Sequence, residues 1–148
     1  METKILDCTI RDGGYLNNWQ FNTDLVKNLY RSVSKSGVDY IEIGFRSNDQ
    51  YFDSSKMGIW RFTPEKVVND IVKNVSGAKV SLMIDYNKAD LSDIPYVSDS
   101  KVDLYRIAAH KNKIIDAIKF ANRITKDKGY EVAVQLMGIV GYTDKDFE

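Results

Sequence analysis

The chain has 148 residues, with 21 Lys and Arg against 21 Asp and Glu, so its formal net charge is zero. This length suggests one domain large enough to bury a core, and the charge balance argues against a nucleic-acid-binding protein. The single cysteine and single histidine exclude a disulfide framework and a His-rich metal cage. No apolar run approaches a membrane span and the N-terminus lacks a signal-peptide core, so we expect a cytoplasmic protein without membrane contact.

Two periodicities alternate along the chain. Segments rich in β-branched or large apolar residues predict strands, and they are Lys4–Ile10, Tyr40–Phe45, Val80–Asp85, Leu104–Ala109 and Glu131–Met137. Apolar residues at helical spacing predict helices between them, and these run from Thr23 to a stop at Gly37, from Thr63 to Gly77, and from about Lys111 to Lys128. This alternation predicts an α/β fold with a parallel sheet.

The two faces of the predicted strands favour a TIM barrel over an open doubly wound sheet. In the second strand Ile41, Ile43 and Phe45 are expected to oppose Glu42 and Gly44. An open doubly wound sheet should be apolar on both faces, whereas a polar face suits the lining of a TIM (β/α)8 barrel. The alternative is that buried charged residues simply pair with each other. The polar set that should converge on the barrel mouth consists of Arg11, Glu42, Asp85, Arg106 and Gln135.

The segment LDCTIRDGGY at Leu6–Tyr15 carries the sharpest chemical pattern. The first strand is expected to deliver Arg11 and Asp12 at its end, with Gly13 and Gly14 turning the backbone beyond them. A carboxylate there can hold a hard divalent cation, and the guanidinium can neutralise an oxyanion that the cation also polarises. The alternative to a catalytic role is a purely structural one, in which Arg11 and Asp12 form a salt bridge at the strand end before a glycine turn.

With its surroundings this segment resembles the DRE-TIM metallolyases, the family of hydroxymethylglutaryl-CoA lyase, isopropylmalate and homocitrate synthases and 4-hydroxy-2-oxovalerate aldolase. The similarity continues through YIEIGF, VSLMIDY and the segment from VDLYRIAAH to GYTD, so it covers essentially the whole chain. The chain resembles in particular the aldolase-like members that open with LDCT(L/I)RDGGY-x-N-x-W-x-F, a pattern that it shows from Leu6 to Phe21.

The resemblance implies roles for several residues. Asp12 corresponds to the first-strand metal ligand, Arg11 to the arginine that stabilises an enolate, and Glu42 to the acidic member of the Asp-Arg-Glu triad. The implied cofactor is Mg²⁺ or Mn²⁺. The implied activity is that of a divalent-metal-dependent aldolase or lyase, which cleaves or forms a carbon–carbon bond of a small 2-oxo acid, such as pyruvate, or an aldehyde.

Two positions depart from the family pattern. Tyr15 stands where pyruvate aldolases carry a histidine; a tyrosine could donate a hydrogen bond or a proton, but its ordinary pKa of about 10 makes it a poor base. The family completes its metal site with a His-x-His on the seventh strand, and the chain has no such motif, only His110 at the end of the predicted fourth strand. Whether the chain itself is an enzyme therefore stays open.

Further residues are candidates for substrate contact. Arg46 and Arg106 could bind a substrate carboxylate or form ion pairs with Glu42 or Asp85, and Asp85 and Gln135 complete the predicted substrate set. The long connection 46–62, with its aromatic residues, could form a lid or an ordinary aromatic core. Cys8 is expected to be a small buried residue rather than a nucleophile.

We therefore expect residues 1–148 to form the N-terminal part of a TIM barrel, with about five strands and without the last three βα units. Three functional readings follow: a metal-dependent aldolase or lyase, an acyl-CoA-using synthase, or a catalytically incomplete half-barrel that needs a partner subunit or the remaining barrel half. A homo-oligomer is expected. An open flavodoxin-like sheet that binds a phosphorylated ligand is disfavoured because RDGGYLNN matches no phosphate-binding loop.

Overall fold

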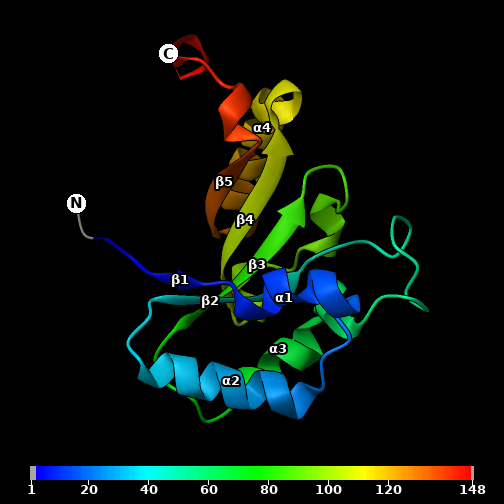
Figure 1. Ribbon diagram of the computed structural model, residues 1–148, viewed down its shortest axis with the longest axis vertical. Coiled ribbons are helices and arrows are strands. Elements are labelled where there is room, and N and C mark those ends of the chain that lie inside the picture. The colour runs from blue at the N-terminus through cyan, green and yellow to red at the C-terminus, as the bar shows by residue number, and fades with distance from the viewer. Residues whose placement is uncertain (1–2, 148) are drawn as a thin grey trace.

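The computed structural model of the chain describes residues 3–147. Its centre is a five-stranded sheet in which every neighbouring pair is parallel and the strand order is β1-β2-β3-β4-β5 (Figure 1). The strands are β1 (Leu6–Asp7), β2 (Tyr40–Phe45), β3 (Lys79–Asp85), β4 (Val102–His110) and β5 (Glu131–Met137). A flavodoxin-like sheet has the order 2-1-3-4-5, so this sequential order excludes it. The predicted N-terminal portion of a barrel is confirmed.

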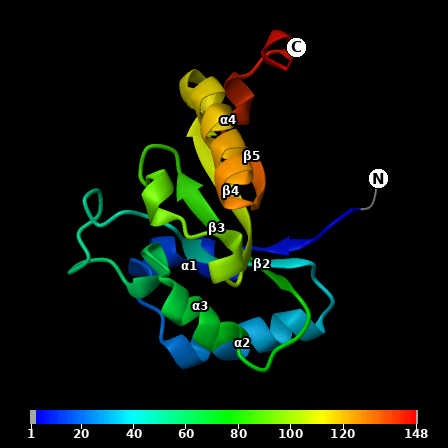
Figure 2. The same cartoon turned by 180° about the vertical axis from the view of Figure 1, so that it is seen from behind.

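Among residues 3–147, four α-helices accompany the sheet, α1 (Thr9–Asn17), α2 (Thr23–Lys35), α3 (Glu65–Val72) and α4 (Ile114–Arg123). Helices α2 and α3 pack against each other below β2, and α4 covers β4 and β5 (Figure 2). Shorter turns are the 3₁₀ helices 59–61, 91–93, 97–99, 111–113, 139–141 and 144–146 and a π-helical turn at 124–128. Within residues 3–147 no helix is long and apolar enough to cross a membrane.

The predicted helix ends are mostly confirmed, with small shifts. Gly37 and Gly129 both adopt positive φ just after a helical segment, as expected of a stop residue. Asn22 rather than Thr23 caps α2, because its side chain accepts a hydrogen bond from the Asp24 amide at 2.8 Å. Helix α3 ends at Val72, well before Gly77.

The main core lies between the sheet and the helices on its outer face. It is built from branched residues of β2, β3 and β4 and from helix residues that are almost fully buried. Representative members are Val26, Ile41, Val68, Leu82, Ile107 and Ala117. The other face of β5 is exposed at Glu131, Ala133 and Gln135, which agrees with the predicted polar lining.

A bulge in β2 changes the face on which Phe45 lies. Between Glu42 and Phe45 the strand advances three residues while its partner β3 advances two, from Ser81 to Met83. The extra residue reverses the alternation, so Phe45 contacts the rings of Tyr15 and Trp19 near α1. The prediction that Phe45 shares the apolar face of Ile41 and Ile43 is therefore wrong.

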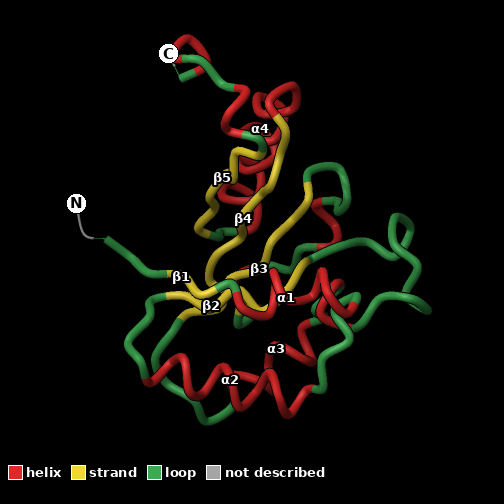
Figure 3. Tube along the Cα trace, viewed as in Figure 1, coloured by secondary structure: helices red, strands yellow, loops and turns green. Residues whose placement is uncertain are grey.

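The N-terminal motif differs most from its predicted form. Strand β1 ends at Asp7, and helix α1 begins at Thr9 and includes Arg11, Asp12 and both glycines. The Asp7 carboxylate accepts hydrogen bonds from the Thr9 amide at 3.1 Å and from its hydroxyl at 2.9 Å, which satisfies one of the free amide groups at the start of the helix. Of the predicted strand Lys4–Ile10 only Leu6–Asp7 forms a strand, and the predicted glycine turn is wrong, because these contacts begin a helix at Thr9 (Figure 3).

Helix α1 depends on contact between Gly14 and Trp19. The chain reverses after the helix through Asn18 and Trp19, both at positive φ. The indole then folds back and donates a hydrogen bond from Nε1 to the Arg11 carbonyl at 3.0 Å. A Cβ atom at Gly14 would lie 2.0 Å from Cδ1 of Trp19, whereas a Cβ atom at Gly13 would meet only Cζ of Phe21 at 3.3 Å.

This contact predicts different effects for two neighbouring substitutions. Gly14→Ala should lower the free energy of unfolding by about 2 kcal/mol, because the methyl group overlaps the Trp19 ring. The matched control Gly13→Ala should change it by less than about 1 kcal/mol, because a helical alanine offsets the small crowding. Urea denaturation of both variants measures the difference, and equal effects would contradict the packing of Trp19 on Gly14.

Candidate functional site

A fully buried carboxylate, that of Glu42, organises the polar face of the sheet. It accepts hydrogen bonds from Nε of Arg11 at 2.7 Å and from Nη1 of Arg106 at 3.0 and 3.2 Å. Oγ of Ser81 donates to it at 3.3 Å and Sγ of Cys8 lies at 3.6 Å. A buried charge needs such partners, and here it has two opposite charges.

The Glu42 cluster consists of Arg11, Glu42, Ser81, Arg106 and Gln135. Each of these residues comes from a different helix or strand. Arg11 lies on α1, Glu42 on β2 and Arg106 on β4, while Ser81 of β3 is the register partner of Glu42. Gln135 of β5 accepts a hydrogen bond from Nη2 of Arg106. The cluster therefore spans the width of the sheet, and the structure brings together four of the five residues of the expected polar set, Arg11, Glu42, Arg106 and Gln135.

The surroundings of Glu42 hold the neighbouring groups in defined protonation states. Burial disfavours the charged guanidinium of Arg11, but the hydrogen bond and charge of Glu42 outweigh it and raise the pKa of Arg11 above its usual value. Burial, together with the charge of Glu42, also raises the pKa of the Cys8 thiol. Cys8 is half-buried at the start of α1, so the prediction that it is buried inside a strand is wrong. Its raised pKa agrees with the expectation that it is not an activated nucleophile.

The carboxylate of Asp12 lies at the edge of the cluster. Its side chain is 60% exposed and forms an ion pair with Nη1 of Arg11. Within residues 3–147 no group of three or more His, Cys, Asp or Glu side chains could hold a metal ion. Since Glu42 is occupied by two arginines, the carboxylate that remains open to a cation is that of Asp12 beside the cluster, and these residues do not make a metal site by themselves.

Tyr15 stands over a cavity beside the cluster. Its side chain is 62% exposed and its ring packs edge-on against Trp19 at 4.8 Å between centroids. The cavity has a volume of about 330 Å³ and lies at the carboxyl ends of β3, β4 and β5; Asp85, Lys88, His110 and Lys113 also line it. His110, expected at the end of the fourth strand, is the last residue of β4.

Asp85 lies outside the Glu42 cluster and pairs with Arg61, a residue that the sequence analysis missed. Nη2 of Arg61 donates to Oδ2 of Asp85 at 2.5 Å. The Arg61 guanidinium also lies over the rings of Phe45 at 4.0 Å and Phe52 at 3.8 Å, although its side chain is only 3% exposed. The sequence pointed to Arg61 only through its place between two aromatic residues in WRF. Its partner Asp85 lies 24 residues further along the chain, so no local pattern connects the two.

Arg46 is also remote from the cluster. It is buried and pairs with Glu65 of α3, whose Oε2 accepts a hydrogen bond from Ser100 Oγ at 2.7 Å. The ring of Tyr105 lies nearby and packs edge-on against Tyr130 at 4.8 Å between centroids. Of the two predicted substrate-binding arginines, Arg106 joins Glu42 and Arg46 joins a separate ion pair with Glu65.

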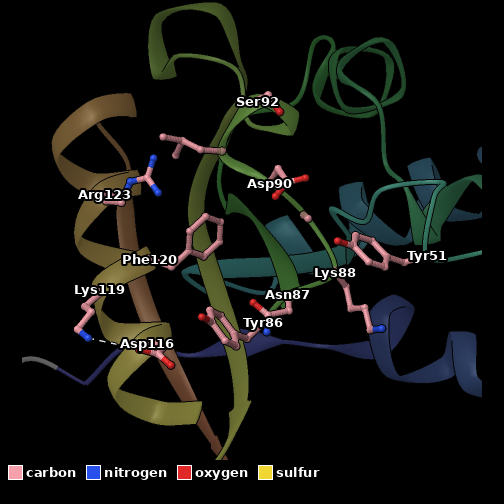
Figure 4. Close-up of a pocket in the computed structure, with 12 residues that line it drawn as sticks. Tyr51, Tyr86, Asn87, Lys88, Asp90, Ser92, Asp116, Lys119, Phe120 and Arg123 are labelled. Atoms are coloured by element: carbon pink, nitrogen blue, oxygen red, sulfur yellow. Dashed lines mark hydrogen bonds and ion pairs between the residues drawn. The ribbon is translucent and has the colours of Figure 1, made fainter.

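The long connection between β2 and α3 contains both core residues and exposed residues. Trp60 is fully buried and donates from Nε1 to the Phe21 carbonyl at 2.9 Å, so this part of the loop belongs to the core. Tyr51 is exposed and borders a groove of about 1040 Å³ between the β3–β4 connection and α4 (Figure 4). Phe120 and Tyr86 form part of the groove wall, with ring centroids 6.3 Å apart.

Comparison with curated proteins identifies lyase-type relatives. The chain is 27% identical over 136 residues to the oxaloacetate decarboxylase of Mycobacterium tuberculosis and 24% identical over 138 residues to 4-hydroxy-2-oxovalerate aldolase 5 of Rhodococcus opacus. The matches cover 92% and 93% of the chain. The chain spans only 39% and 38% of the length of these two relatives. No protein-family model matches the sequence.

Solved structures show the same fold. The N-terminal domain of an inferred aldolase from Bacteroides vulgatus matches with a TM-score of 0.79 and 30% identity, over 97% of this chain and 48% of that one. A hydroxymethylglutaryl-CoA lyase from Acinetobacter baumannii matches with a TM-score of 0.61 and 9% identity, over 99% of this chain and 52% of that one, and supports the fold alone. The predicted resemblance to the N-terminal part of the DRE-TIM metallolyase barrel is confirmed.

The Glu42 cluster predicts a large effect on stability. Glu42→Gln should lower the free energy of unfolding by about 3 kcal/mol, because two partly buried guanidinium groups lose their counter-charge. The control Asp12→Asn removes an exposed carboxylate from the same cluster and should change stability by less than about 0.5 kcal/mol. Urea denaturation at neutral pH measures both variants, and a Glu42→Gln protein as stable as the control would contradict the central role of this carboxylate.

The buried tyrosine predicts a pH dependence. Burial raises the pKa of the Tyr105 hydroxyl above its ordinary value, against a smaller opposing effect of Arg46. The unfolded chain therefore releases this proton first as the pH passes about 10, and the free energy of unfolding falls with increasing pH above that value. Tyr105→Phe should make this fall less steep, and Tyr96→Phe, at an exposed tyrosine, should not. If the free energy of unfolding fell equally steeply with pH in the wild type and in Tyr105→Phe, the predicted role of the Tyr105 hydroxyl would be contradicted.

Proposed function

We propose that the full protein is a divalent-metal-dependent aldolase or lyase that cleaves or forms a carbon–carbon bond next to the carbonyl of a 2-oxo acid, through an enolate. We propose further that residues 1–148 supply the N-terminal part of its barrel and that the remaining βα units complete the catalytic domain. A small 2-oxo acid or aldehyde is the proposed substrate and the cytoplasm the proposed location.

One observation carries this proposal: two arginines from different elements converge on one buried carboxylate at the inner face of the sheet. Arg11 and Arg106 are held by Glu42 at 2.7 Å and 3.0 Å. Their side chains are 12% and 17% exposed, so part of each guanidinium remains accessible. Preorganised cations of this kind stabilise negative charge that develops on a substrate oxygen.

The residues of the chain divide the proposed chemistry between them. In the cleavage direction, the hydroxyl on the departing carbon loses its proton to water and becomes an aldehyde carbonyl. The electron pair of the broken carbon–carbon bond forms the enolate of the 2-oxo acid, whose oxygen the Arg11 guanidinium would neutralise. Arg106 would hold the substrate carboxylate, and Gln135 would fix the Arg106 guanidinium from β5. Glu42 keeps both arginines in place, and Tyr15, at the mouth, could donate a proton to the carbanion carbon.

A metal would take Asp12 as one oxygen ligand in this proposal. Mg²⁺ and Mn²⁺ prefer carboxylate and water oxygens, and the exposed position of Asp12 suits this role. When bound, such an ion polarises the carbonyl oxygen of the substrate. Its other protein ligands would have to come from outside residues 3–147, which alone provide no group of three.

A second candidate function is that of a half-barrel that acts only with a partner. The observation that favours it is the edge of the sheet at β5, where Val132, Val134 and Leu136 are only partly buried and no described strand pairs on the far side. An unpaired edge strand is a surface for association. Light scattering distinguishes the two candidates, because a folded, active monomer would contradict the need for a partner.

Enolisation of pyruvate tests the proposed chemistry in the full protein. Arg11→Gln should slow exchange of the methyl protons of pyruvate for deuterium, followed by proton NMR, by at least about 100-fold, since a preorganised cation at the developing oxyanion is lost. Asp12→Asn should weaken Mn²⁺ binding at least about tenfold. The control Asp24→Asn on α2 should change neither the exchange rate nor the Mn²⁺ affinity. An unaltered Mn²⁺ affinity in Asp12→Asn would contradict the assignment of Asp12 as a metal ligand.

A further inference from the structure

A buried polar cluster between α3 and the sheet takes no part in the proposed reaction. This Arg46 cluster consists of Arg46, Glu65, Ser100, Tyr105 and Tyr130. The Arg46 guanidinium pairs with Oε1 of Glu65, and Oε2 of Glu65 accepts a hydrogen bond from Ser100 Oγ at 2.7 Å. The rings of Tyr105 and Tyr130 pack edge-on beside these contacts, with centroids 4.8 Å apart. The cluster therefore joins α3 to β4 and to the residue that precedes β5.

Three polar atoms of the Arg46 cluster have no hydrogen-bond partner among residues 3–147. They are Nε of Arg46 and the hydroxyl oxygens of Tyr105 and Tyr130. The two tyrosines are 0% and 1% exposed, and the Arg46 side chain is 8% exposed. Buried polar groups are nearly always hydrogen-bonded, because an unpaired one loses its bonds to water without compensation. Three such atoms in one cluster therefore point to a bound molecule that pairs with them.

The three atoms lie close together. Burial raises the pKa of both tyrosine hydroxyls, and the charge of the nearby Arg46 guanidinium opposes this effect at each of them. The Tyr130 hydroxyl also lies beside Ser100, which lowers its pKa. Arg46 follows β2, Tyr105 belongs to β4 and Tyr130 precedes β5, so each polar atom is held by a different part of the sheet. The three side chains surround one position that none of them fills with a hydrogen-bonding atom.

The chemistry of these atoms fits a water molecule. Nε of Arg46 can only donate a hydrogen bond, whereas each tyrosine hydroxyl can donate or accept one. A water oxygen accepts from Arg46 and from one tyrosine, and one water hydrogen is donated to the other tyrosine. These three hydrogen bonds are the number typical of a buried water. An anion such as chloride also needs donors, but Glu65 already balances the charge of Arg46, so a further buried charge would have no counter-charge.

We propose that one water molecule binds between Nε of Arg46 and the hydroxyls of Tyr105 and Tyr130 as an internal part of the fold. Through the Arg46–Glu65 pair it links α3 to β4 and to the start of β5. Ser100 also lines a surface groove of about 500 Å³, which gives the water a route for slow exchange with solvent. The proposal is independent of the reaction proposed above, because none of these residues takes part in it.

Relaxation dispersion of oxygen-17 in labelled water tests the proposal, because its amplitude reports the water molecules that tumble with the protein. The double substitution Tyr105→Phe and Tyr130→Phe keeps both rings and leaves a water only one partner, Arg46, whereas a buried water needs at least two. The amplitude should therefore fall by that of one water molecule. The matched control is the double substitution Tyr51→Phe and Tyr96→Phe at two exposed tyrosines, which should keep the wild-type amplitude.

A double-mutant cycle on the same two hydroxyls gives a second measurement. If one water joins them, the second substitution should lower the free energy of unfolding less when the first is already present. A wild type without oxygen-17 dispersion, an unchanged amplitude in the double variant of Tyr105 and Tyr130, or additive effects in the cycle would overturn the water site. A thermal midpoint that rises in sodium chloride but not in sodium gluconate of equal ionic strength, and only when both hydroxyls are present, would identify a chloride ion and overturn the assignment of water.

Discussion

The structure depends on one buried carboxylate, that of Glu42. Glu42 is inaccessible to solvent, and its carboxylate is stabilised by the guanidinium groups of Arg11 and Arg106. Burial of an unpaired carboxylate is prohibitively costly, so α1, β2 and β4 must adopt the positions that supply both partners. The ion pairs that hold the sheet edge and helix α1 together are therefore the same ones that place two cations at the inner face.

A second constraint positions the residues around this charge. The bulge in β2 sends Phe45 to the side of Tyr15 and Trp19, and Arg61 then packs on Phe45 and pairs with Asp85. Asp85 at the carboxyl end of β3 is thereby neutralised. The bulge thus places Phe45 where the ion pair of Arg61 and Asp85 packs against its ring.

The parts of the fold that were predictable are those governed by local patterns. Strands β2 and β5 begin and end at the predicted residues, because their alternation and composition are local properties. The polar lining residues Glu42, Arg106 and Gln135 were found in the same way. The start of the chain was not, because TIRDGGYLN becomes a helix through contacts with Asp7 and Trp19 that outweigh the low helix propensity of two glycines.

The sequence by itself determined the α/β class, the parallel half-barrel and the family resemblance. These features depend on hydrophobic periodicity and on the motif around Arg11, which are local patterns along the chain. Only the tertiary structure decided which charges meet. Arg106 and Glu42 are 64 residues apart, Arg61 and Asp85 are 24 apart, and Arg46 joins Glu65 rather than the central cluster. Such pairings follow from strand register, the bulge and burial, because electrostatic energy depends on distance and desolvation in space and not on separation along the chain.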